Sequence, residues 1–456
     1  MCGIFGISNH KDAARLTYLG LYALQHRGEE SAGIVARHHK KLINHKGLGL
    51  VGDIFKEGVL KALKGDIAVG HVRYSTTGST TTRNIQPFYI KHKKETLAIA
   101  HNGNLINTAE LHRQLEKNGA IFQTTMDSEV IAHLFTHANE KDHKKLVSNM
   151  LAQLQGAFSL VMLLNDTLIG ARDPFGWRPL CIGKLDGSYV LASETCALDL
   201  IQAEYVRDVE PGEIVFITKK GIESIKPKKE HKKAFCIFEY IYFSRPDSNI
   251  FGHNVYLSRK QLGKQLAKEH PVDCDLVMSI PDSGSYAAVG YAAALKKPCE
   301  VGMIRNHYVG RTFIQPSQFI RDFKVKVKLN PIKAVLRGKK VVVIEDSIVR
   351  GTTSKARIKA LRDAGAKEIH MRVTCPPLKY PCFFGLDFPT KKELIASNQS
   401  VKEIANYLGL DSLEYISLEG MLKSMKQADN DFCTACFNGD YPVKLPKKMS
   451  KYTLEK

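Results

Sequence analysis

One stretch, residues 341–353, limits the possible folds of this chain more than any other. It opens with four apolar residues, Val-Val-Val-Ile, which predict a strand buried on both faces of its sheet. Two carboxylates, Glu345 and Asp346, follow at once, and after a short turn the pattern predicts a helix over residues 354–364. A strand, a turn and a helix in immediate succession favour a parallel sheet with a ligand site at its carboxyl edge.

The turn between this strand and this helix suits a phosphate. Gly351 permits close approach of the backbone, and the free amides at the start of the helix favour an anion. Three hydroxyls accompany them, on Ser347, Thr352 and Thr353. Glu345 and Asp346 can bind ribose hydroxyls or a magnesium ion. The Walker A pattern is absent, and no lysine is placed to reach a β-phosphate, so the expected ligand is not ATP.

Length and composition indicate a globular protein with room for two domains. The chain has 456 residues, of which 44% are hydrophobic and 25% charged. It contains no apolar run of membrane length and begins without a secretory signal pattern, so we expect a cytoplasmic protein with no membrane partner. Its ten cysteines are then expected to be reduced thiols, catalytic groups or metal ligands rather than disulfides.

The formal net charge of +20 would suit a nucleic-acid partner. The lysine-rich stretches 226–233 and 444–451 nevertheless lack interleaved aromatic residues, and no known nucleic-acid-binding motif accompanies them. We therefore expect a solvated basic surface and no nucleic-acid partner. A positive field would also help to collect a highly phosphorylated substrate.

The N-terminus carries a second candidate site. Removal of Met1 would expose Cys2 as residue one, and its α-amine could then accept the thiol proton without a separate histidine. Residues 3–7 read as a strand that starts beside this nucleophile. By itself the pattern is weak, because cysteines also fill cores.

Four further segments strengthen the nucleophile hypothesis: residues 26–33, 70–76, 101–104 and 125–129. Together with Cys2 they resemble the class II, N-terminal-nucleophile glutamine amidotransferase domain. Hydrolysis of an amide needs donors for the tetrahedral oxyanion, a role that suits the Asn102 side chain and the Gly103 amide. The resemblance assigns Arg73 to the α-carboxylate of glutamine and Asp127 to its α-ammonium group.

Residues 346–353 resemble the phosphoribosyl pyrophosphate (PRPP) motif of type I phosphoribosyltransferases, in the form found in amidophosphoribosyltransferases. The resemblance makes residues 281–284 the pyrophosphate loop and residues 305–318 a mobile lid. The PRPP-binding residues that it implies are Asp282, Ser283, Arg311, Glu345, Asp346, Ser347, Arg350, Gly351, Thr352 and Thr353. The implied Mg²⁺ ligands are Ser283, Glu345 and Asp346. Two residues depart from the family pattern: His307 replaces an arginine, and Glu345 replaces an aspartate.

Four of the ten cysteines form a possible cluster: Cys236, Cys382, Cys433 and Cys436. The Cys433-x-x-Cys436 pair is a two-ligand chelate, and two distant cysteines would complete four thiolates around zinc or an iron–sulfur cluster. Spacing alone does not choose between them. Because these segments resemble the branch of amidophosphoribosyltransferases that carries a structural [4Fe-4S] cluster, we favour the cluster, with Zn²⁺ as the alternative.

The expected architecture has two domains. Residues 2–230 are predicted to form a four-layer αββα amidotransferase sandwich, and residues 231–456 a type I phosphoribosyltransferase α/β domain with a parallel sheet and a C-terminal cluster-binding segment. The resemblance implies hydrolysis of L-glutamine at Cys2 and attack of the ammonia on C1 of PRPP. Pyrophosphate leaves and 5-phosphoribosylamine forms, the first step of purine synthesis. It further implies purine nucleotide feedback inhibitors and a homo-oligomer, a dimer or tetramer.

Two competing interpretations each account for one half of the chain. Another enzyme of the N-terminal-nucleophile class, such as glucosamine-phosphate synthase or asparagine synthetase, would have no use for the PRPP motif at residues 346–353. A PRPP-sensing regulator with a DNA-contacting face would have no use for Cys2 with Arg73, Asn102 and Asp127. Neither interpretation explains both halves of the chain.

Overall fold

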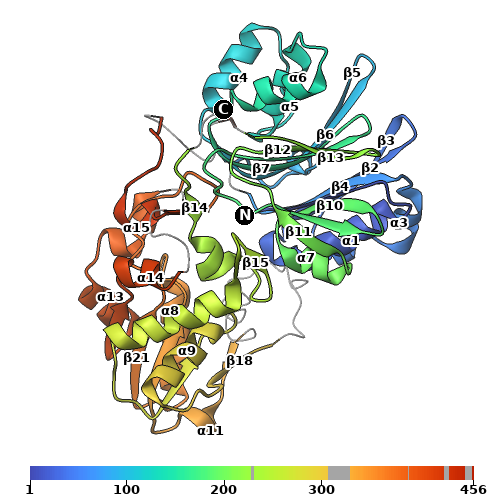
Figure 1. Cartoon of the computed structure of the whole chain (residues 1–456). Coiled ribbons are helices and arrows are strands. Elements are labelled where there is room, and N and C mark those ends of the chain that lie inside the picture. The colour runs from blue at the N-terminus through green and yellow to red at the C-terminus, as the bar shows by residue number, and fades with distance from the viewer. Residues whose placement is uncertain are drawn as a thin grey trace.

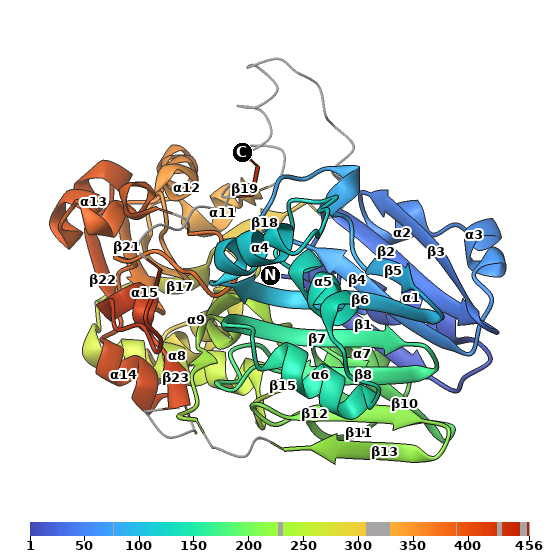
Figure 2. The ribbon, with the colours of Figure 1, turned by 90° about the horizontal axis from the view of Figure 1, so that it is seen from above.

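The computed structural model describes residues 1–75, 77–226, 231–306, 329–388, 390–425, 431–446 and 454–455. The predicted site residue Arg311 and the departure at His307 lie outside these ranges. The first half of the chain forms two stacked antiparallel sheets covered by helices, and the second half forms a smaller parallel sheet (Figure 1). Both views place the N-terminus between the two halves (Figures 1 and 2).

The first sheet has seven strands, and its central strand starts next to the predicted nucleophile, Cys2. In order they are β11 (Glu204–Asp208), β9 (Cys181–Leu185), β10 (Ser188–Ala192), β1 (Gly3–Ser8), β4 (Ile67–Arg73), β2 (Ser31–His38) and β3 (Lys41–Leu48). Strand β1 pairs antiparallel with β10 and β4, and all six of its residues are buried. Cys2 therefore sits at the head of a strand that is fixed on both edges.

The second sheet has six strands and carries the predicted oxyanion residues. In order they are β13 (Gly221–Ile225), β12 (Ile214–Thr218), β8 (Thr167–Arg172), β7 (Gly156–Leu164), β6 (Glu95–Leu105) and β5 (Phe88–His92). The apolar layer between the two sheets includes Ile4, Val69 and Val161, each almost completely buried. The long strand β6 pairs with β7 from Leu97 to Leu105 and brings Asn102 and Gly103 close to its far end.

Helices cover both outer faces, as Figure 1 shows. The helices on the first sheet are α1 (Ala13–Ala23), α2 (Val51–Ile54), α3 (Glu57–Ala62) and α7 (Thr195–Leu200); those on the second are α4 (Thr108–Lys117), α5 (Glu129–His137) and α6 (His143–Leu151). The predicted αββα sandwich is confirmed. Helix α6 ends at Leu151, and residues 152–154 close its last turn with backbone hydrogen bonds.

The second half contains a four-stranded parallel sheet, as predicted. Its order is β17 (Leu276–Ser279), β20 (Lys340–Glu345), β21 (Glu368–Val373) and β22 (Ser412–Tyr415). The helices around it are α8 (Val255–Glu269), α9 (Ser285–Leu295), α11 (Lys333–Leu336), α12 (Thr352–Asp363), α13 (Val401–Leu408), α14 (Leu418–Lys423) and α15 (Ala435–Asn438). Helix α12 starts two residues earlier than expected, so both predicted phosphate-binding threonines lie in its first turn.

Short elements complete this half. They are the hairpins β15 (Asn249–Ile250) with β16 (His253–Asn254) and β18 (Met303–Arg305) with β19 (Leu329–Pro331), the π-helix Glu239–Phe243, and the parallel pair β14 (Phe235–Cys236) with β23 (Phe432–Cys433). Among the residues described, no helix is both long enough and apolar enough to cross a membrane.

Candidate active sites

Cys2 lies in a buried pocket at the edge of the first half of the chain. Its Sγ is 3.5 Å from both the backbone nitrogen and the carbonyl oxygen of Tyr74. Its backbone N–H donates to Oδ1 of Asn102 at 3.1 Å. Burial raises the pKa of the Cys2 thiol. Met1 is also buried and makes this nitrogen an amide; its removal would place an α-amine at the same point, next to the thiol.

Asn102, the first of the two predicted oxyanion donors, contacts Cys2 directly, and Gly103 follows it on β6. The Asn102 side chain uses Oδ1 to hold Cys2, while its buried Nδ2 has no hydrogen-bond partner among the described residues. Gly103 has a positive φ of 156°, and a Cβ there would lie 2.0 Å from the carbonyl oxygen of Ala157. An unsatisfied buried donor costs free energy unless a ligand accepts from it.

Arg73 and Asp127 are both buried and carry opposite charges. The Arg73 guanidinium is buried and donates to the carbonyls of residues 77–79 at 3.0–3.2 Å. Asp127 accepts from the Leu105 N–H at 2.9 Å and lies 3.6 Å from His101 Nδ1. Although burial raises the pKa of Asp127, His101 and these hydrogen bonds hold it below its usual range. A buried carboxylate that stays ionised suits an ammonium group.

A second, larger site lies where β17 and β20 end. These neighbouring parallel strands deliver Asp282 and Ser283 on one side and Glu345 and Asp346 on the other, into a cavity of about 800 Å³. The Ser283 and Ser347 hydroxyls both donate to the Asp346 carboxylate. The strand ends therefore bring these predicted residues together, as expected for an open parallel sheet.

The start of α12 forms the phosphate-binding end of this cavity. Gly351 adopts a left-handed φ of 75°, and a Cβ there would lie 2.9 Å from Ile395 Cδ1. Thr352 and Thr353 follow in the first helical turn and line the cavity. Arg350 also lines it, but its guanidinium forms an ion pair with Glu393.

Glu345 does not point a free carboxylate into this cavity. Its Oε2 accepts from Arg357 Nη1 at 3.1 Å, and burial together with the neighbouring Asp346 raises the pKa of Glu345 to about 8. The sequence analysis missed Arg357, which lies one helical turn beyond Thr353 on the same side of α12. The spacing of three to four residues in a predicted helix could have placed it at this site.

Residues from the first half also line the cavity. His26 and Tyr74 line it together with Arg259 and with Tyr242 and Phe243 of the π-helix. The backbone of Tyr74 contacts Cys2 Sγ, so one residue separates the two candidate sites. Sequence reasoning missed these contacts, because each joins elements that lie far apart in the chain.

The four predicted metal-ligating cysteines surround a third, small cavity. Cys236 and Cys433 are directly opposite each other in the β14–β23 pair, and Cys436 follows on α15. With Cys382 they line a cavity of about 20 Å³. Burial raises the pKa of Cys236 to about 11 and that of Cys433 to about 12. Arg178 and Trp177 also line this cavity, and a hydrogen bond from the Trp177 side chain to Cys433 opposes the effect of burial on the pKa of that thiol.

The fold and the first two sites define a class II, N-terminal-nucleophile glutamine amidotransferase joined to a phosphoribosyltransferase-like domain. Residues 71–200 match the family model described as a glutamine amidotransferase domain. The chain is 48% identical to the amidophosphoribosyltransferase of Bacillus subtilis over 97% of its own length and 94% of that protein. It is 48% identical to the amidophosphoribosyltransferase of Methanocaldococcus jannaschii, with 98% of each covered.

Solved structures agree with these relatives. The glutamine PRPP amidotransferase from B. subtilis, complexed with ADP and GMP, superposes with a TM-score of 0.92 at 47% identity, covering 98% of both chains. A structure described as the allosteric regulatory enzyme of purine biosynthesis gives a TM-score of 0.93 at 47% identity, covering 98% of this chain and 97% of that one. The chain belongs to the amidophosphoribosyltransferase family, glutamine-dependent enzymes of the first step of purine biosynthesis.

Proposed function

We propose that Cys2, once Met1 is removed, hydrolyses glutamine. The α-amine takes the thiol proton, and the thiolate attacks the amide carbon of glutamine. Asn102 Nδ2 and the Gly103 N–H stabilise the oxyanion, ammonia leaves, and water then releases glutamate from the glutamyl thioester. Arg73 binds the substrate carboxylate and Asp127 its ammonium group. The observation that carries this proposal is the buried Asn102 Nδ2, unpartnered among the described residues and on the same side chain that holds the Cys2 nitrogen.

We propose that the larger cavity holds PRPP. The amides and hydroxyls of Ser347, Thr352 and Thr353 receive its 5-phosphate at the start of α12, and Asp346 receives the ribose hydroxyls. Asp282 and Ser283 face the pyrophosphate. The carboxylate of Asp346 and the hydroxyl of Ser283 suit Mg²⁺, which would neutralise the leaving pyrophosphate. Ammonia attacks C1, pyrophosphate departs, and 5-phosphoribosylamine forms.

Glu345 can bind Mg²⁺ only after its side chain moves away from Arg357. In the structure its carboxylate is held by Arg357, and the raised pKa of Glu345 favours its neutral form. Asp346 remains the ligand of first choice, and Glu345 would join only after release from Arg357. Arg350 would similarly have to leave Glu393 to contact PRPP. The proposed part of Arg311 falls on a residue outside the described ranges.

The contact between the two sites supports internal transfer of ammonia. Tyr74 lines the PRPP cavity, and its backbone lies 3.5 Å from Cys2 Sγ. Ammonia released at Cys2 therefore starts next to the wall of the second cavity. We place the boundary between the two domains at residues 230 and 231.

We propose that the four cysteines hold a [4Fe-4S] cluster. The four thiols line one small cavity, which suits a cluster whose four irons each take one thiolate. Arg178 offsets their negative charge, and the Trp177 N–H could donate to a sulfur. Such a group would act as a structural cross-link, because neither half-reaction transfers an electron.

Regulation by purine nucleotides and assembly into a dimer or tetramer complete the proposal. The B. subtilis relative was solved with ADP and GMP, which supports nucleotide binding by this chain as well. The compartment remains a prediction, because one relative, from Arabidopsis thaliana and 50% identical over 97% of this chain, is named as chloroplastic.

Cys2→Ala tests the proposal. It should abolish synthesis of phosphoribosylamine from glutamine while leaving synthesis from added ammonia intact, because the thiol serves only the first half-reaction. Blocking the removal of Met1 with an N-terminal extension should have the same effect. Loss of both activities in folded Cys2→Ala protein would overturn the assignment of two separate sites.

A further inference from the structure

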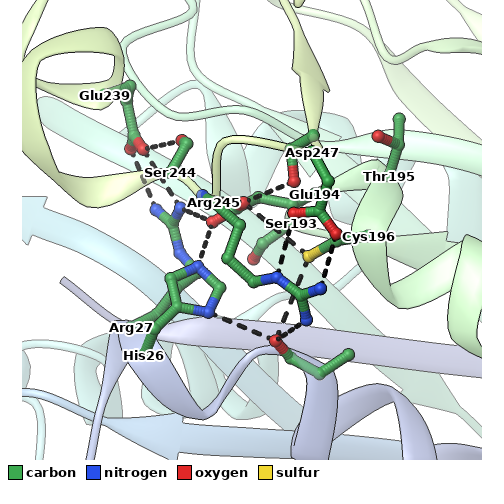
Figure 3. A network of polar contacts seen from close by, with 12 residues as sticks. His26, Arg27, Ser193, Glu194, Thr195, Cys196, Glu239, Ser244, Arg245 and Asp247 are labelled. Atoms are coloured by element: carbon green, nitrogen blue, oxygen red, sulfur yellow. Dashed lines mark hydrogen bonds and ion pairs between the residues drawn. The ribbon is translucent and has the colours of Figure 1, made fainter. Parts of the chain in front are cut away.

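A fully buried ion network ties the nucleophile residue to the second half of the chain (Figure 3). At its centre is Arg27, whose side chain is completely inaccessible. Its Nε donates to the backbone carbonyl of Cys2 at 2.9 Å. Its two terminal nitrogens donate to Glu194 and, in a bidentate pair at 2.9 and 3.0 Å, to Glu239.

The two carboxylates come from opposite halves of the molecule. Glu194 directly precedes α7 of the amidotransferase sandwich, whereas Glu239 begins the π-helix of the second half. Each is anchored by a neighbouring hydroxyl: Ser248 donates to Glu194 at 2.7 Å, and Ser244 donates to Glu239 at 2.8 Å. Figure 3 shows Arg27 pointing between them.

Electrostatics make this arrangement rigid. Although burial lowers the pKa of Arg27, Glu239 and Glu194 raise it above its ordinary value, so the guanidinium stays charged. Removing one partner of a buried ion pair is strongly destabilising, because it leaves an uncompensated buried charge. Arg27 cannot rotate away from the two carboxylates without that cost, and the Cys2 carbonyl is held by the same group.

Cys2 is thereby fixed on both sides of its α-carbon. Asn102 Oδ1 holds its nitrogen and Arg27 Nε holds its carbonyl oxygen. The Asn102 side chain also carries the proposed oxyanion donor, so the direction of Sγ relative to that donor depends on both anchors. A misplacement of about 1 Å can lower a rate by on the order of 100-fold.

We infer that Arg27 is a positioning residue for the nucleophile and that Glu239 makes its position depend on the second half of the chain. The amidotransferase site is thus completed by a carboxylate from outside its own sandwich. The inference rests on the proposed role of Cys2 and adds to it a residue that sets the orientation of the thiol.

Glu239→Gln tests this inference. The amide keeps the size of the side chain but turns an N–H₂ group toward one guanidinium nitrogen, so the bidentate pair is lost. We expect the kcat for glutamine hydrolysis to fall roughly 10- to 100-fold with a much smaller change in KM. The rate at which iodoacetamide alkylates Cys2 should change together with kcat. Ammonia-dependent synthesis should stay within about twofold of the parent.

Two controls separate positioning from general stability. Arg172→Lys alters another completely buried arginine, which donates to backbone carbonyls of residues 176, 178 and 209 and does not contact Cys2. It should lower Tm without a selective loss of glutamine hydrolysis. Ser258→Ala removes a hydrogen bond to the Asn254 carbonyl at the start of α8 and leaves the Arg27 network untouched, so its kcat should match the parent.

The outcomes are distinct. Folded Glu239→Gln with a parental kcat and alkylation rate would overturn the inference, as would equal loss of both half-reactions. If Glu239→Gln does not fold, Arg27→Lys takes its place, because lysine keeps the charge but has no Nε–H for the Cys2 carbonyl. Failure of the proposed function shows elsewhere, as retained glutamine-dependent synthesis in Cys2→Ala.

Discussion

At the scale of single residues, the amidotransferase site depends on one side chain with two tasks. Asn102 accepts from the Cys2 nitrogen with Oδ1 and leaves Nδ2 without a partner in the described structure. Asn102→Asp keeps the acceptor and removes the donor. We expect the kcat of glutamine hydrolysis to fall by about 10²- to 10³-fold, the usual cost of one oxyanion donor. Steady-state kinetics measure this, with ammonia-dependent synthesis as the internal control; an unchanged kcat would remove Asn102 from the oxyanion site.

His71 gives a second residue-scale prediction, for acid stability. It is fully buried on β4, and burial lowers its pKa to about 3 from the usual 6.5. Between these values the unfolded chain binds a proton that the folded chain excludes, so stability rises with pH and is lost as pH falls from 6.5 toward 3. One such group contributes a slope of up to about 1.4 kcal/mol per pH unit.

His71→Asn should therefore flatten the dependence of the unfolding free energy on pH between about 4 and 6, as measured by urea denaturation. The exposed His39→Asn serves as the control and should keep the parental slope. If both variants keep that slope, His71 does not titrate as its burial implies.

At the scale of elements, the link from β20 to α12 is the part of the fold that the sequence predicted best. Four apolar residues, two carboxylates and a glycine turn indicate strand, ligands and helix start by local chemistry alone. The pairing of Arg27 with Glu239 could not be predicted in this way. Such pairs depend on side-chain reach between elements, and for Arg27 the partner lies 212 positions away.

The sequence also could not predict strands β14 and β23. Two residues are too few for a periodic pattern, yet their pairing brings Cys236 opposite Cys433. Cysteine count and spacing indicated the four-thiol site, while the sequence left open which elements would carry it. Composition was therefore a better guide to this site than secondary-structure propensity.

Gly351 allows a prediction at the element scale. An alanine at this position would have to keep the left-handed φ of 75°, and its Cβ would contact Ile395. Gly351→Ala should therefore distort the start of α12 and weaken PRPP binding about tenfold. Isothermal titration with PRPP measures the change. Gly409→Ala is the matched control: its φ of 79° imposes similar strain at the end of α13, with open space around the added Cβ. Equal PRPP affinity in the two variants would contradict a special role for Gly351.

At the scale of the whole molecule, the four cysteines bring the start, middle and end of the second half to one cavity, where the proposed cluster would cross-link them. Cys433→Ser should give low soluble yield, a lower Tm and little bound iron, because the group that holds these segments together is lost. Iron and sulfide analysis of protein purified without oxygen, together with thermal denaturation, measures this. The exposed Cys299→Ser should behave like the parent. Stoichiometric zinc without iron or sulfide would overturn the cluster and leave the four-thiolate site standing.

The parallel bridge between β14 and β23 also has a consequence for biosynthesis on the ribosome. Cys236 and Cys433 are direct neighbours in space, but at 5–20 residues per second about 10–40 seconds of translation separate them. The amidotransferase sandwich can fold during that interval, while Cys236 and its apolar neighbours wait for the strand that covers them. A metal group bound by all four thiols could therefore be completed only after Cys433 and Cys436 have been synthesised.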